Sequence, residues 1–183
     1  FWNPEKNDID FKYYIEKNNL AKPDLLFTFL TGNGLYVPYS NEFITHEKYA
    51  TKFLEQFHKD FPNALIGVMG IELPCCNGGV TACYGAQGYY HDWYGDTVTT
   101  LNYDKWLENF TKLEEHASYM TYFDIKSQFD SEYSYPVELM KVNNRSEILE
   151  RIGTNGLHPS IDGYKQIGDA FYRFLVEMVK RIK

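Results

Sequence analysis

The residues just before the last predicted helix carry the clearest potential for chemistry. His158 is followed by Pro159 and is preceded, three residues earlier, by Asn155. An imidazole can take a proton from a hydroxyl nucleophile, and a polar side chain beside it can fix which ring nitrogen carries the proton. The pattern therefore predicts a general base with an orienting partner. Asp162 is an alternative orienter, although its place one turn into the following helix directs it elsewhere.

A second polar position follows the first buried run of the chain. The apolar run begins at Leu25 and ends at Leu30, and Gly32 and Asn33 come directly after it. A side-chain amide at the end of a strand can donate a hydrogen bond to the oxyanion that develops during acyl transfer. The alternative is that Asn33 is only a turn residue, because glycine and asparagine are common in turns.

The segment that contains Asn155, His158 and Pro159, followed by Gly163 and Tyr164, resembles the last block of the SGNH (GDSL-type) hydrolases. In that family the histidine is the general base, and an acidic residue three positions earlier orients it. The resemblance implies these two roles for His158 and Asn155, with an amide in place of the acid. An amide can fix a tautomer but gives the imidazolium no stabilising charge.

The resemblance extends to the end of the first strand. The family carries a Gly-x-Asn-Asp block there, whose asparagine donates to the oxyanion hole. It implies that role for Asn33, with Gly32 at the substrate, while Thr31 and Gly34 stand where the family has glycine and aspartate. Hydrolysis in this family uses no metal or cofactor, and we expect none.

The nucleophile of such a site is missing from the 183 residues. The family's serine lies in a Gly-Asp-Ser motif after its first strand. No serine of this chain lies in Gly-Asp-Ser or in a G-x-S-x-G elbow: Ser40, Ser118, Ser127, Ser131, Ser134, Ser146 and Ser160. The chain starts at Phe1, so we expect an N-terminally incomplete domain over residues 1–183. Either a preceding segment or a partner strand would then pair with the exposed edge from Leu25 to Leu30.

The elements around these residues predict an α/β fold. Continuous apolar runs predict buried strands at 25–30, 64–70 and 119–125. Amphipathic spacing predicts helices at 41–61, at 103–117 and from Ser160 or Asp162 onward. Alternating strands and helices favour a parallel sheet in a three-layer α/β/α arrangement. The resemblance makes this the flavodoxin-like SGNH fold without its N-terminal strand or strands.

Residues 73–100 predict a long loop at the functional edge of the sheet. The loop is rich in glycine and tyrosine, and loops of this length are often binding walls or lids. His91 and Trp93 are candidates to line a substrate pocket, as a platform for sugar rings or within a self-packed surface loop. Cys83 can form a local disulfide with Cys75 or Cys76, or all three can be thiols.

Composition narrows the partners. The chain has 18 Lys+Arg against 25 Asp+Glu, a formal net charge of −7, and no basic cluster beyond its last residues. We therefore expect no nucleic acid partner. No apolar run is long enough to cross a bilayer. The compartment stays open, with a secreted or periplasmic setting as one alternative.

Two functions follow from this pattern. The first is a serine esterase of the SGNH type that hydrolyses small acyl esters, including O-acetyl groups on carbohydrate as a substrate implied by the resemblance. The second is an inactive descendant of that fold that binds glycans or assembles with other proteins. The absent serine and Asn155 favour the second function, and the intact pair His158-Pro159 favours the first.

Overall fold

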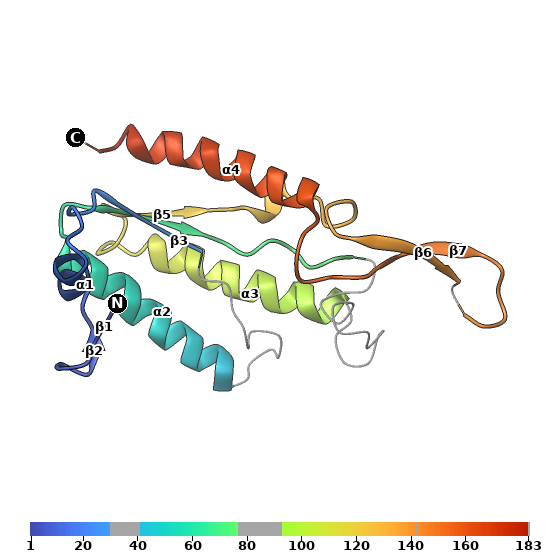
Figure 1. The fold of residues 1–183 in the computed structure, drawn as a ribbon, viewed down its shortest axis with the longest axis horizontal. Coiled ribbons are helices and arrows are strands. Elements are labelled where there is room, and N and C mark those ends of the chain that lie inside the picture. The colour runs from blue at the N-terminus through green and yellow to red at the C-terminus, as the bar shows by residue number, and fades with distance from the viewer. Residues whose placement is uncertain (30–40, 77–92, 142, 183) are drawn as a thin grey trace.

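A parallel three-stranded sheet forms the centre of the protein (Figure 1). The computed structural model describes residues 1–29, 41–76, 93–141 and 143–182, and at 41–43 and 93–96 it describes the backbone only. The strands are β3 (Leu25–Phe29), β4 (Leu65–Met69) and β5 (Met120–Phe123), in the order β3-β4-β5. Phe27 is in register with Gly67, which is in register with Thr121. All three predicted strands are confirmed, and so is their parallel pairing.

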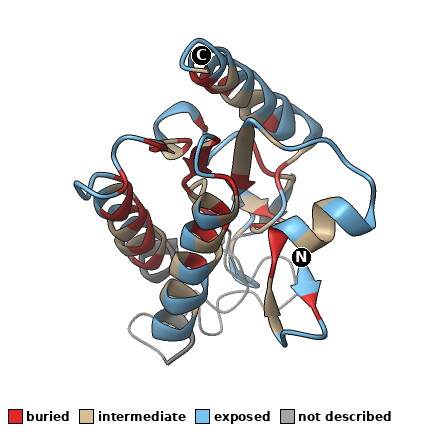
Figure 2. Ribbon diagram, turned by 90° about the vertical axis from the view of Figure 1, so that its left-hand side faces the viewer, coloured by how far each residue is buried: buried red, intermediate tan, exposed pale blue. Residues whose placement is uncertain are grey.

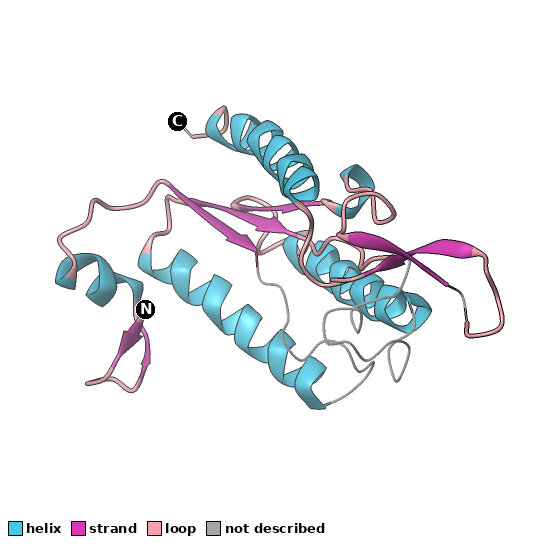
Figure 3. Ribbon diagram, turned by 45° about the vertical axis from the view of Figure 1, so that its right-hand side comes forward, coloured by secondary structure: helices cyan, strands magenta, loops and turns pink. Residues whose placement is uncertain are grey.

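Helices cover both faces of this sheet (Figure 3). Helix α4 (Ile161–Val179) lies on one face, and α2 (Asn41–Asp60) and α3 (Trp93–Thr111) lie on the other. Apolar cores fill both spaces, as the buried residues in Figure 2 show. On the α2 and α3 side, Leu54 and Leu107 pack with strand residues such as Ile66. On the α4 side, Phe174 and Met178 pack with others such as Phe123.

The boundaries of α3 differ from the sequence prediction. We expected a loop as far as residue 100 and a helix over 103–117, whereas α3 begins at Trp93 and ends at Thr111. Glycine and threonine in its first turns hide the helical spacing, because both residues have low helix propensity. Leu113 falls within the range predicted for this helix, but it lies beyond the end of α3 and is exposed. No helix in the described parts of the chain is both long and apolar enough to cross a bilayer.

Several short elements were not predicted. Near the N-terminus these are β1 (Trp2–Asn3), β2 (Asp8–Ile9) and α1 (Phe11–Lys17). Phe11 packs edge-on against the rings of Phe53 and Phe57 and so docks α1 on α2. The connection after β5 contains a 3-10 turn, η2 (Lys126–Gln128), and an antiparallel hairpin of β6 (Val137–Lys141) and β7 (Leu149–Gly153). The hairpin projects from the end of the sheet opposite both termini (Figure 1).

A half-buried histidine in the α2 layer predicts a pH-dependent stability. His58 stacks on Tyr119 with 3.4 Å between ring centroids, and its Nδ1 is buried with no hydrogen-bond partner among the described residues. Burial, and then the nearby His116, lowers the pKa of His58 below its usual value.

The folded protein binds a proton at His58 less readily than the unfolded chain does. The contribution of His58 to stability is therefore complete above about pH 6.5 and is lost as the pH falls through that value. We expect the free energy of unfolding, measured with urea between pH 7.5 and 5.5, to fall less steeply in His58→Gln than in the unmodified chain. Equal slopes would contradict the prediction.

Candidate functional site

The candidate base lies in a tight turn between β7 and α4. The side-chain Oδ1 of Asn155 accepts the backbone N–H of His158 at 2.8 Å and that of Leu157 at 3.2 Å. Ser160 then caps α4, since its Oγ accepts the N–H of Gly163 at 3.2 Å. Asparagine and serine favour such local side-chain to backbone bonds, so the residue types themselves dictate the turn. His158 is left exposed at the tip of this turn.

Asn155 also faces the imidazole ring. Its Nδ2 is 3.5 Å from Nδ1 of His158, near the outer limit for a hydrogen bond. The two backbone donors on Oδ1 settle the orientation of the amide, so an N–H group is directed at Nδ1. This contact favours the tautomer in which Nε2 carries the proton. A base acting through Nε2 needs the opposite tautomer, in which Nδ1 carries it.

Two other segments hold the turn from outside. The N–H of Ser160 donates to the carbonyl of Ser134 at 2.7 Å, and the N–H of Cys75 donates to the carbonyl of Gly156 at 3.3 Å. Gly163 lies so close to this junction that a Cβ there would overlap the Ser134 carbonyl and approach the Pro159 Cβ to 2.8 Å. The position of His158 therefore depends on backbone contacts with the segments after β4 and after η2.

The turn lies at the carboxyl end of the sheet, where ligands bind in open α/β folds. Asn33, Gly32, His91 and Cys83 lie outside the described residues, so their predicted roles and the disulfide stay predictions. Trp93 is the first residue of α3, and its side chain is also outside the description. β3 ends at Phe29, four residues before Asn33, so the chain does enter that segment from the carboxyl edge.

The remaining histidines of the described parts have structural contacts. Nε2 of His46 is 2.8 Å from the Tyr103 hydroxyl, and Nδ1 of His116 is 2.9 Å from the Phe110 carbonyl. His116 was expected in a helix but lies in turns beyond α3. The alternative orienter Asp162 accepts a hydrogen bond from Lys165 at 2.9 Å. Among the described residues, Asn155 is the polar side chain that contacts the His158 ring.

The described residues place no hydroxyl or thiol in a hydrogen bond with His158. Ser134, next to the turn, is fully buried, and its Oγ has no hydrogen-bond partner in this part of the structure. Burial also raises the pKa of the Cys76 thiol, which opposes the thiolate that a nucleophile needs.

Sequence reasoning missed a buried ionic cluster at the same end of the sheet. Asp104 of α3 is 2 % exposed, and its Oδ2 is 3.3 Å from Nζ of Lys126. Burial raises the pKa of Asp104 to about 6 and also raises the pKa of the neighbouring Glu72. The signal was the spacing, because Asp104 falls on the apolar face that Leu107 and Phe110 define.

This cluster is not a metal centre. In the part of the chain that the structure describes, no group of three or more His, Cys, Asp or Glu side chains is arranged to hold a metal ion.

Comparison with protein-family models, with curated proteins and with solved structures gives no match.

The close approach at Gly163 predicts a sharp position effect within one helix. Gly163→Ala should lower the free energy of unfolding by about 1–3 kcal/mol, because the new methyl overlaps a backbone carbonyl. Gly168→Ala is the matched control, since nothing lies within 4 Å of a Cβ at that position. Alanine there should stabilise the exposed helix by about 0.5–1 kcal/mol. Urea unfolding of both variants tests this, and equal effects would contradict it.

Proposed function

We propose that the protein is a serine ester hydrolase of the SGNH type, with His158 as general base and the nucleophilic serine supplied from outside residues 1–183. The observation that carries the proposal is the turn itself. Asn155 holds His158 exposed at the carboxyl end of a parallel sheet, at the start of a capped helix. The order of strands and of the helix after His158 also agrees with the family's third, fourth and fifth strands and its last block.

Asn155 sets the expected strength of this site. The imidazole needs Nδ1–H to act through Nε2, and Asn155 presents a donor rather than an acceptor to Nδ1. Loss of one orienting hydrogen bond costs about 1 kcal/mol, and an amide gives the imidazolium no stabilising negative charge. We therefore propose a slow hydrolase, whose turnover an acidic residue at position 155 would raise.

The outer edge of β3 is the proposed place for the missing part of the site. Among the described residues β3 pairs with β4 only. Because Leu65 donates to the carbonyl of Asp24, the alternation of a parallel ladder directs the N–H and C=O groups of Leu25, Phe27 and Phe29 away from β4. Unpaired backbone groups of this kind are a template for another strand.

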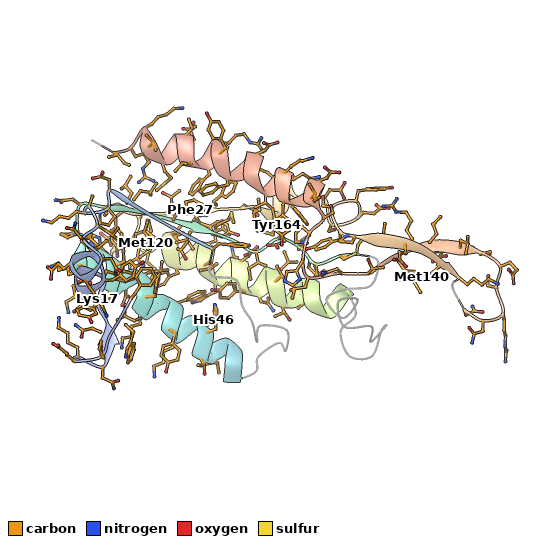
Figure 4. All side chains as sticks on the ribbon, in the orientation of Figure 1. Lys17, Phe27, His46, Met120, Met140 and Tyr164 are labelled. Carbon is orange, nitrogen blue, oxygen red and sulfur yellow. The ribbon has the colours of Figure 1, made fainter. Side chains whose placement is uncertain are left out.

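Helix α4 supports the same edge. Its flank beside β5 is charged, with Arg173 bonded to Gln128 and Arg181 to Thr121. The opposite flank lies beside β3, where the rings of Phe171 and Phe27 are 4.2 Å apart (Figure 4 shows Phe27 below α4). On that flank Tyr164 and Val179 are both 53 % exposed.

The apolar flank of α4 lies over the outer edge of β3, and this arrangement is suited to one more strand of the sheet. We propose that this strand runs parallel to β3 and ends, like β3, at the carboxyl edge where His158 lies. A serine just after it would then come close to the imidazole. This arrangement supplies the nucleophile and covers Tyr164 and Val179 together.

The proposed substrates are small acyl esters, including O-acetyl groups on carbohydrate. His158 is exposed, and the large apolar side chain of Ile161 at the start of α4 is exposed as well. An open base with an apolar neighbour in the chain can reach an ester carried on a bulky sugar. The acyl group itself follows from the resemblance rather than from a pocket.

A glycan-binding module is the second candidate, and the Asn155 contact favours it. With Nε2–H presented to solvent, His158 can donate a hydrogen bond through Nε2 but cannot take a proton at that atom. Such a donor can bind a sugar hydroxyl or an ester carbonyl without cleaving it. Binding of an acetylated oligosaccharide with no release of acetate would support this candidate over the hydrolase.

Replacing His158 tests the proposed chemistry. In the complete protein, His158→Ala should lower the turnover of p-nitrophenyl acetate by about a hundredfold, because the serine loses a base that the amide at position 155 already weakens. His46→Ala, which removes a histidine bonded to Tyr103 in the α2 layer, is the control. An unchanged rate in His158→Ala would remove this residue from the mechanism.

Replacing Asn155 tests the proposed orientation. Asn155→Asp keeps one oxygen for the N–H groups of Leu157 and His158 and offers the second to Nδ1–H. Turnover should rise at least about tenfold, which recovers part of the roughly 10⁴-fold loss that an Asp to Asn change causes in a serine protease. A rate that falls or stays constant would show that Asn155 is not the orienting residue.

Lysine at the β3 edge tests the missing strand. Residues 1–183 alone should associate with increasing concentration, and Phe29→Lys should suppress this, because a charge on an edge strand disfavours pairing. Leu139→Lys, at an exposed leucine of the hairpin, should leave association unchanged. Light scattering with size-exclusion chromatography measures both. A stable, monodisperse monomer of the unmodified chain would contradict the prediction.

A further inference from the structure

The buried Asp104 makes its second contact with the backbone that leaves β4. The last ladder bond of β4 is donated by Gly70 to the carbonyl of Phe123 at 2.9 Å. The next N–H, that of Ile71, lies beyond the end of β4 and donates to Oδ1 of Asp104 at 2.8 Å. A Cβ at Gly70 would come within 2.8 Å of that same oxygen, so the close approach requires glycine there. Asp104 therefore fixes where the chain goes after the strand.

Lys126 anchors Asp104 in turn. Its Nζ lies 3.3 Å from Oδ2 of Asp104 and donates to Asp124 at 2.7 Å and to the Tyr122 hydroxyl at 3.1 Å. Taking a carboxylate out of water is costly unless a counter-charge and hydrogen bonds offset the cost. Lys126 and the Ile71 N–H supply both. The pair thus gives the carboxylate one defined position between α3 and the segment after β5.

From Ile71 the chain runs directly to the turn that carries His158. The carbonyl of Leu73 accepts the Tyr135 hydroxyl at 2.8 Å. The N–H of Cys75 donates to the carbonyl of Gly156, and the N–H of Cys76 donates to the carbonyl of Ser131 at 3.1 Å. We call residues 71–76 the β4 strap. One end of the strap is fixed by Asp104, and the other is fixed to the backbone two residues before His158.

We infer that Asp104 is a positioning residue for His158, acting through the β4 strap. The role of His158 in turnover rests on the proposed function, but the mechanical link from Asp104 to the turn does not. Asp104 sets the direction of the strap at Ile71, and Tyr135 supports its middle. The N–H of Cys75 then binds the carbonyl of Gly156, which fixes the turn at a point separate from the contact between Ser160 and Ser134.

The test compares two substitutions at Asp104 in the full 183-residue chain. Asp104→Leu removes the acceptor for Ile71, whereas Asp104→Asn keeps an oxygen acceptor. In Asp104→Leu the Cys75 amide should exchange with solvent about tenfold faster than global unfolding explains, the change expected from loss of a buried hydrogen bond. The NMR signal of the His158 ring should shift as well. Asp104→Asn should restore both readouts toward the unmodified chain.

Glu108→Gln is the matched control, because Glu108 is a carboxylate of the same helix that bonds to Lys105 and Lys112 rather than to Lys126 or the strap. It should leave Cys75 exchange and the His158 signal unchanged. If Asp104→Leu leaves both readouts as in the unmodified chain, or if Asp104→Asn fails to restore them, the inference is wrong.

A second variant covers the case in which Asp104→Leu does not fold. Tyr135→Phe removes the hydroxyl that supports Leu73 and should produce the same two changes, with Tyr133→Phe as its exposed control. Unchanged readouts in Tyr135→Phe would also overturn the link. Neither readout depends on ester turnover, so a failure of the proposed hydrolase and a failure of this inference are distinguishable.

Discussion

The interaction on which the site depends is the pair of backbone hydrogen bonds accepted by Oδ1 of Asn155. Because Leu157 and His158 donate to this oxygen, the amide has only its N–H group left to direct at the imidazole. The same two bonds therefore build the turn, expose His158 and bias its tautomer. An aspartate would serve the turn equally well and would offer a second acceptor to the ring. The choice of amide at position 155 separates an efficient base from a weak base or a hydrogen-bond donor.

The rest of the fold brings three backbone segments to this turn. The parallel sheet ends where the turn lies, the Ser160 cap begins α4 there, and the β4 strap reaches Gly156 from the other side. The ionic contact of Asp104 with Lys126 fixes the origin of the strap inside the core. A series of polar contacts along the β4 strap thus connects α3 and the sheet to the turn that carries the candidate base. Among the described residues the outer edge of β3 pairs with no other strand, and this edge is the proposed place for the strand that completes the site.

The elements with clear apolar patterns could be predicted from the sequence, since α2 and α4 each pack an apolar face against one side of the three apolar strands. The start of α3 could not, because the low helix propensity of its glycine and threonine residues is outweighed by tertiary packing. Tyr164 and Val179 illustrate a different limit. Their spacing marks an apolar face correctly, but spacing cannot say whether anything in this chain covers it.

The contact between Asn155 and His158 could be predicted from the sequence, because the two residues lie three positions apart and contact each other locally. Asp104 was not, because its contacts with Ile71 and Lys126 depend on the fold. The tautomer of His158 tests the account most directly. Nitrogen-15 NMR of the neutral ring should show Nε2 protonated and Nδ1 bare in the unmodified chain. A ring with Nδ1 predominantly protonated would contradict the proposed role of Asn155, because its amide would then face a second donor.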